Sequence, residues 1–101
     1  MVKVLVCYNL KPDQNVAEYE KWLKDEHHPR MKSVPGAVDS KTLKVNSVMQ
    51  GSFPYQYVAE VRMENEMTVM SAAGSGQMMQ LMAQWTPKIA NFSIVVTREL
   101  E

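Results

Sequence analysis

Residues 2–10 of the chain read VKVLVCYNL, and this stretch decides the fold that we expect. Alternate residues of a strand point to opposite sides. One side would carry apolar or aromatic residues at Val2, Val4, Val6 and Tyr8, and the other at Leu5 and Cys7. A strand that is apolar on both sides is normally covered on both sides. We therefore expect a central strand with helices on one side and further protein on the other.

The next segment, from Val16 to about His28, has the spacing of a helix. Five of its residues and near neighbours recur every three or four positions and form one stripe, namely Val16, Tyr19, Leu23, His27 and Met31. Asp13 or Asn15 can cap the first turn. Pro29 has no backbone N–H and disfavours helical geometry at His28, so we expect the helix to kink or tighten there.

The rest of the chain predicts three more strands and a second helical region. The strands are Ala37 to Met49, Tyr55 to Glu64 and Phe92 to Arg98, and the helices are Glu66 to Ala73 and Gln77 to Trp85. The order βαββαβ predicts an α+β, ferredoxin-like domain over residues 1–101, with a four-stranded antiparallel sheet and its helices on one face. A second copy is the simplest cover for the other face, so we expect a homodimer.

Composition excludes several classes of function. Lys plus Arg and Asp plus Glu number 11 each, and this neutral balance lacks the field that attracts nucleic acid. The single cysteine, Cys7, excludes an intrachain disulfide and suits a reducing cytoplasm. No apolar run has membrane-spanning length, and no signal peptide opens the chain. We expect a cytoplasmic protein that binds neither nucleic acid nor membrane.

His27 is the first candidate for catalysis. It lies on the apolar stripe, four residues from both Leu23 and Met31, so its ring should point toward the sheet. A neutral imidazole in such a place can take a proton from one atom and return it to another. The alternative is a core histidine bonded to a backbone carbonyl, but a polar group on a buried stripe calls for a function.

His28 is a second catalytic candidate, because Pro29 can turn it inward although it starts about 100° away around the helix. Its alternative is a solvent-facing residue at the kink. Adjacent helical residues point apart, so Glu26, His27 and His28 make a poor chelate, and we expect no metal site and no cofactor.

Seven further residues are candidates for binding a substrate. Tyr8, Asn9 and Tyr57 can orient a carbonyl group, although core packing or turn chemistry explains Tyr8 and Asn9 as well. Met67, Met70, Met82 and Trp85, with Met78, can form the wall of an apolar pocket, and Met67 and Met70 should face inward. Such a stripe is also the ordinary pattern of a core helix.

Short motifs across the chain carry a family resemblance. The stretch from Tyr19 to Leu23, the step His27-His28-Pro29, the entry Val34-Pro35-Gly36-Ala37-Val38 and the late pair Met82 and Trp85 resemble the dimeric α+β barrel superfamily. Within it, the chain resembles the EthD-like branch and the small RedY/HapK-like proteins of prodiginine-type pigment pathways. The resemblance implies a pocket between sheet and helices. It also implies cyclisation and dehydration of pyrrole- or indole-containing intermediates, one activity among the monooxygenases, cyclases and other enzymes of the superfamily.

Three hypotheses for the function follow. In the first, a cofactor-free enzyme binds a small, flat, apolar aromatic intermediate of secondary metabolism, and His27 acts as general base and then general acid in a cyclisation or dehydration. In the second, a cofactor-independent monooxygenase positions an electron-rich aromatic compound and dioxygen. In the third, a dimer binds and carries a reactive intermediate without changing it.

Overall fold

The structure, a computed structural model, describes residues 1–100 and contains four strands with two helical regions. In chain order the elements are β1 (Val2–Leu10), α1 (Val16–Trp22), the π-helical turn η1 (Leu23–His27), α2 (His28–Lys32), β2 (Ala37–Lys44), β3 (Tyr57–Met63), α3 (Glu66–Ala73), α4 (Gly76–Trp85), the short 3-10 turn η2 (Thr86–Lys88) and β4 (Ile89–Arg98).

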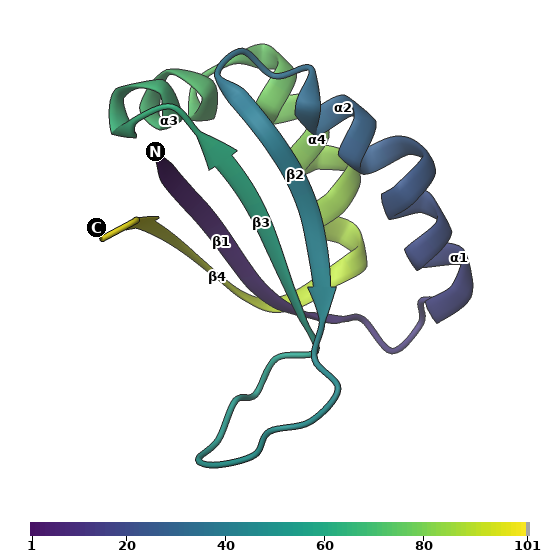
Figure 1. Cartoon of the computed structure of the whole chain (residues 1–101). Coiled ribbons are helices and arrows are strands. Elements are labelled where there is room, and N and C mark those ends of the chain that lie inside the picture. Colours follow the sequence, from purple (N-terminus) through teal and green to yellow (C-terminus); the bar gives the residue numbers. More distant parts are fainter. Residues whose placement is uncertain (101) are drawn as a thin grey trace.

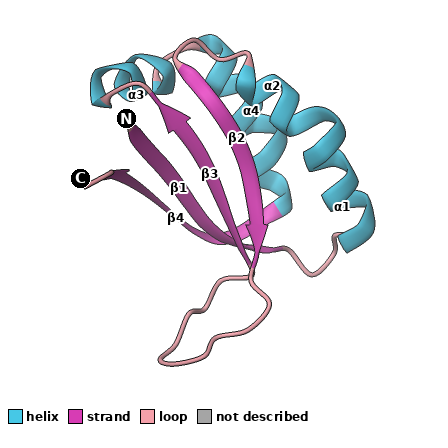
Figure 2. Cartoon of the chain, in the orientation of Figure 1, coloured by secondary structure: helices cyan, strands magenta, loops and turns pink. Residues whose placement is uncertain are grey.

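The four strands form one antiparallel sheet in the order β2-β3-β1-β4. The helices gather over one face of this curved sheet, with α1 and α2 on the side of β2 (Figure 1). Colouring by secondary structure separates this helical layer from the strands (Figure 2). The predicted α+β, ferredoxin-like fold is therefore confirmed. Within residues 1–100, no helix has the length and apolar character needed to cross a bilayer.

The central strand β1 is buried where the sequence predicts. Val2, Val6 and Tyr8 lie beneath the helices in two neighbouring clusters of buried residues. The helical stripe packs against them at Tyr19, Leu23, His27 and Met31, while Val16 at its start is exposed. Asn15 is the N-cap, because its side chain accepts a hydrogen bond from the backbone N–H of Glu18 at 3.0 Å.

Two strands are shorter than predicted and one is longer. β2 ends at Lys44, and β3 begins at Tyr57, so residues 45–56 form a long loop that extends beyond the end of the sheet (Figure 1). Asn9 fixes the base of this loop through its side-chain amide, which donates to the Pro54 carbonyl and accepts from the Gln56 N–H. β4 begins earlier than predicted, at Ile89, because Ile89 pairs with Leu10 of β1.

Gly36 turns the chain from the helical region into β2. Its φ of +88° is one that residues with a Cβ rarely adopt, and a Cβ at this position would overlap the Thr68 Cγ2 methyl group of α3. Gly51 in the long loop has a φ of +76° but open space around it. A substitution at Gly51 therefore introduces backbone strain alone, whereas one at Gly36 introduces both strain and a steric clash.

We predict that Gly36→Ala lowers the free energy of unfolding by more than Gly51→Ala. Strain alone costs roughly 1–2 kcal/mol at each position, and the overlap with Thr68 adds about 1–3 kcal/mol at Gly36. Urea denaturation of both variants measures the difference. Equal losses in the two variants would contradict this packing of α3 on the turn.

Candidate functional site

The local backbone explains how two adjacent histidines reach different surroundings. Pro29 leaves the helix without one N–H donor, and the N–H of His28 bonds to the carbonyl of Leu23, five residues earlier. The predicted kink is thus a widened π-helical turn instead of a tightened one. Single π turns occur frequently at functional sites. Here the turn ends at His27, directly before α2 begins at His28.

An apolar cavity of about 320 Å³ lies between the sheet and the helices. Aliphatic and methionine side chains from β1, β3, β4, α2, α3 and α4 form most of its wall, and they include Val4, Val6, Met31, Ala59, Val61, Met63, Val69, Ala72, Met78, Met82, Ile94 and Val96. Trp85 closes part of the wall, and the polar lining residues are His27, His28 and Ser40. The cavity therefore combines an apolar surface with a few polar groups, as ligand sites commonly do.

His27 lines this cavity and is only 4% exposed. Its ring lies between two indoles, with centroids 4.8 Å from Trp85 and 5.1 Å from Trp22. Burial, with smaller contributions from the neighbouring basic groups of His28 and Arg30, lowers the pKa of His27 to about 4. The imidazole is therefore neutral at pH 7.

The ring nitrogens of His27 have no hydrogen-bond partner among residues 1–100. No hydrogen bond within residues 1–100 contributes to its pKa shift. Arg62 Nε is the one fully buried side-chain nitrogen or oxygen without a partner in that range, so the nitrogens of His27 are not completely buried. The sequence prediction that His27 points toward the sheet is confirmed, whereas its catalytic role remains a prediction.

His28 points toward β2. Its Nδ1 lies 2.7 Å from Ser40 Oγ and its Nε2 lies 2.8 Å from Thr42 Oγ1. Burial lowers the pKa of His28, and Lys32 adds to this effect while Asp39 opposes it. The ring of His28 is 5.3 Å from that of His27, centroid to centroid. The two imidazoles are neighbours, but only His28 is held by hydroxyl groups.

Tyr8 packs in the core and does not line the cavity. It is fully buried, and its hydroxyl accepts a hydrogen bond of 2.7 Å from Tyr19. Tyr19 in turn accepts one of 2.8 Å from Trp85 Nε1. Burial raises the pKa of Tyr8, which keeps its hydroxyl protonated. This network fixes Trp85 in the cavity wall, so Tyr8 contributes to the site through packing.

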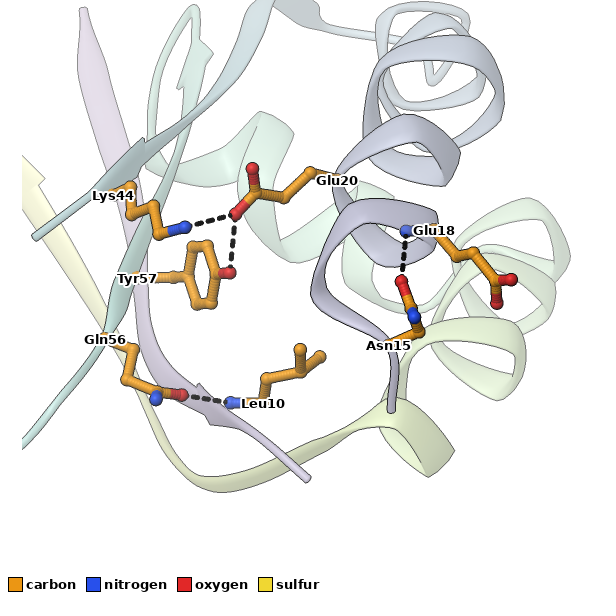
Figure 3. Close-up of polar contacts among 7 residues, drawn as sticks. All are labelled: Leu10, Asn15, Glu18, Glu20, Lys44, Gln56 and Tyr57. Carbon is orange, nitrogen blue, oxygen red and sulfur yellow. Dashed lines mark hydrogen bonds and ion pairs between the residues drawn. The ribbon is translucent and has the colours of Figure 1, made fainter. Parts of the chain in front are cut away.

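Tyr57 lies in a second hollow, a polar groove of about 420 Å³ between the helices and β2. Its hydroxyl donates to Glu20 Oε2 at 2.8 Å, and the same oxygen accepts from Lys44 Nζ at 2.8 Å (Figure 3). Burial and the negative charge of Glu20 raise the pKa of Tyr57. The groove has a lining of Glu20, Leu23, Lys24, His28, Lys32, Ser40, Lys41, Thr42, Lys44 and Tyr57.

The structure brings together four of the nine predicted site residues. His27, His28, Met82 and Trp85 line the cavity, whereas Tyr8 and Tyr57 lie outside it and Asn9 anchors the loop. The expected inward orientation of Met67 and Met70 is wrong, because they are 81% and 75% exposed. Helix α3 instead turns Val69 and Ala72 toward the sheet, where the small Ala72 permits close packing.

Ser40 and Thr42 are site residues that sequence reasoning missed. They alternate on the face of β2 that pairs with Val61 and Ala59, the helix-facing positions of β3. β2 is polar on both sides, so its sequence alone did not distinguish this face from the other.

Among residues 1–100, no group of three or more His, Cys, Asp or Glu side chains is arranged to hold a metal ion.

The fold and cavity define a ferredoxin-like α+β domain with an apolar cavity between its sheet and its helices. A family model described as REDY-like protein HapK matches residues 2–100. The chain therefore belongs to the HapK family of REDY-like proteins, and the resemblance seen in its motifs is confirmed. No sequence among the curated proteins matches the chain.

Solved structures share this fold at low sequence identity. HapK from Hahella chejuensis aligns with a TM-score of 0.80 at 13% identity, covering 99% of this chain and 93% of that one. An ethyl tert-butyl ether d (EthD) family protein from Bacillus halodurans gives 0.72 at 14%, covering 99% and 100%. Hydroxynitrile lyase from Passiflora edulis gives 0.81 at 11%, covering 99% and 94%. At such identities the likeness shows the fold alone, and the lyase shows that an enzyme can be built on it.

We predict that His27 makes the protein less stable in acid. Its pKa is 6.5 in its ordinary state and about 4 in the folded protein. Between these values the unfolded chain binds more protons, so the stabilisation is complete above about pH 6.5 and is lost as the pH falls toward 4. At about 1.4 kcal/mol for each pKa unit, the loss reaches roughly 3 kcal/mol.

Urea denaturation of the wild type and His27→Gln over this pH range measures that loss. The glutamine variant should lose less stability than the wild type, because the acidic side chains that also titrate are common to both proteins. Parallel stability curves for the two proteins would contradict the desolvated environment of His27.

Proposed function

We propose that the protein is a small cofactor-free enzyme of secondary metabolism, which cyclises or dehydrates a flat aromatic intermediate of pyrrole, indole or polyketide type. The observation that carries this proposal is a neutral imidazole, His27, in the wall of a largely apolar cavity. Membership of the HapK family supports it as well.

The cavity favours an apolar, planar ligand. Its volume of about 320 Å³ is near the lower end of the range for small-molecule sites. Trp85 lines the cavity together with Met31, Met63, Met78 and Met82, so an aromatic ring entering it finds an indole π-surface and methionine side chains around it. The few polar groups are concentrated at one side, where they can orient a single carbonyl or hydroxyl group.

His27 suits a reaction in which one proton is removed and then returned. Burial favours its neutral form, which is the form that accepts a proton. Burial also makes the imidazolium short-lived, because the cavity offers it little solvation. We propose that His27 takes a proton from a carbon beside a carbonyl group and gives it to the departing hydroxyl group, which leaves as water.

The test uses a panel of apolar β-hydroxy ketones with phenyl, pyrrole or indole rings. Its first member is the aldol adduct of benzaldehyde and acetone, whose dehydration gives conjugated benzylideneacetone. We predict that His27→Gln lowers kcat by roughly 10²–10⁴-fold, the usual contribution of general acid–base catalysis. Glu26→Gln, a change of the exposed neighbouring residue, should leave kcat unchanged.

Three results separate the alternatives. Full turnover by a folded His27→Gln protein would remove the proposed mechanism. Product formation that requires dioxygen would favour the monooxygenase. Quenching of tryptophan fluorescence by the panel, with no product from the wild type, would favour a binding or carrier protein.

We also propose that the enzyme is a homodimer joined through the outer face of the sheet. Within residues 1–100 all helices pack on the other face, and the outer face carries apolar residues from all four strands, namely Leu5, Cys7, Leu43, Val58 and Val95. Charges of both signs flank them, with Glu60 between Lys3 and Lys41. A second copy of the same surface can cover the apolar residues and pair with these charges.

Two adjacent residues of β4 provide a matched test of this interface. Val95 is 46% exposed on the outer face, and Val96 is 47% exposed on the helix side. We predict that Val95→Glu shifts the protein to monomers in sedimentation at micromolar concentration, whereas Val96→Glu leaves the assembly unchanged. A wild-type monomer, or equal effects of the two variants, would contradict the proposed dimer.

A further inference from the structure

Three side chains connect the apolar cavity with the polar groove. The hydroxyl of Ser40, the imidazole of His28 and the hydroxyl of Thr42 form a chain of two hydrogen bonds, 2.7 Å at Nδ1 and 2.8 Å at Nε2. Ser40 and His28 line both spaces, whereas Thr42 lines only the groove. The chain therefore runs through the wall that separates the two spaces.

Each member of the chain is suited to passing a proton. Ser40 is only 5% exposed, and it is one of the three polar residues that line the cavity. Hydroxyl groups both donate and accept hydrogen bonds, so neutral His28 can carry its proton on either nitrogen and keep both partners. Burial lowers the pKa of His28, which keeps the ring in the neutral form that such an exchange requires.

The groove end of the chain meets charged groups and solvent. The titratable side chains around His28 are Glu20 and Lys24 of α1 and η1, Lys32 of α2, Asp39, Lys41 and Lys44 of β2, and Tyr57 of β3, with His27 beside it. The hydroxyl of Tyr8 lies next to that of Thr42. The carboxylate of Glu20 already accepts hydrogen bonds from Lys44 and Tyr57. His27, by contrast, has no such connection to the groove.

We propose that Ser40 is a catalytic proton donor and that His28 and Thr42 form a relay that supplies its proton from the groove. This inference rests on the proposed function, in which a substrate carbonyl lies in the cavity. Ser40 would touch that carbonyl oxygen, while Thr42 is a positioning residue because it acts through His28.

When His27 removes a proton from the carbon, Ser40 gives its hydroxyl proton to the carbonyl oxygen, and the enol forms. Ser40 receives the Nδ1 proton of His28, whose Nε2 takes the hydroxyl proton of Thr42, and Thr42 takes one from water in the groove. When the enol collapses, His27 gives its proton to the departing hydroxyl group, and every proton in the relay moves back. Overall, one molecule of water leaves the substrate and the protein is unchanged.

The first test needs no substrate. Nitrogen-15 NMR of the histidine rings in the whole protein reports which nitrogen of His28 carries the proton. We predict that wild-type His28 exchanges between both tautomers. In Thr42→Val the proton of His28 should stay on Nδ1, because Ser40 is then its only hydroxyl acceptor. In Ser40→Ala it should stay on Nε2, because only Thr42 can then accept it. Thr42→Ser, which retains the hydroxyl, should resemble the wild type. One fixed tautomer common to all four proteins would overturn the relay.

The second test uses turnover of a β-hydroxy ketone from the panel. Ser40→Ala should lower kcat on the order of 10²-fold. Thr42→Val should lower kcat and reduce the solvent deuterium isotope effect without changing KM, and Thr42→Ser should restore both. If His27→Gln is inactive while Ser40→Ala and Thr42→Val have wild-type rates and isotope effects, the relay is wrong and the proposed function stands. If His27→Gln retains full turnover, the proposed function itself is wrong.

Discussion

The packing of one helical stripe on the central strand is the constraint on which this structure depends. Tyr19, Leu23, His27 and Met31 occupy successive turns and are all buried against the sheet. The hydroxyl of Tyr19 connects the sheet with helix α4, since it donates to Tyr8 of β1 and accepts from Trp85 of α4. Because His27 is part of the same stripe, the contacts that hold the helices in place also desolvate its imidazole. Fold stability and the chemistry of the site therefore have one physical origin.

Much of the fold could be predicted because its signals are local. The alternation in residues 2–10 gives a strand with two apolar faces, and the spacing from Tyr19 to Met31 gives the helix that covers it. Boundaries were less accurate where contacts between distant segments decide them. Strand β3 begins later than predicted, at Tyr57, directly after the two positions, Pro54 and Gln56, that Asn9 holds through contacts between segments far apart in the sequence.

The candidate site could be predicted only in part. The orientation of His27 followed from the stripe, but that of His28 depends on the π turn and on two hydroxyl groups from another strand. Ser40 and Thr42 carried no signal of their own, because β2 is polar on both sides. The sequence pattern places Met67 and Met70 on the buried face of α3, but the helix buries Ala72 instead. Which side of α3 is buried depends on how closely the helix approaches the sheet, and the sequence of the helix alone does not show this.

Two adjacent imidazoles thus have separate environments, one apolar and one bonded to hydroxyl groups, and the proposed acid–base chemistry depends on that difference. Titration of the His27 ring protons by NMR in the folded protein tests it most directly. We predict a pKa of about 4 for His27. A value at or above the ordinary 6.5 would mean that the ring is solvated or paired, and would contradict the account.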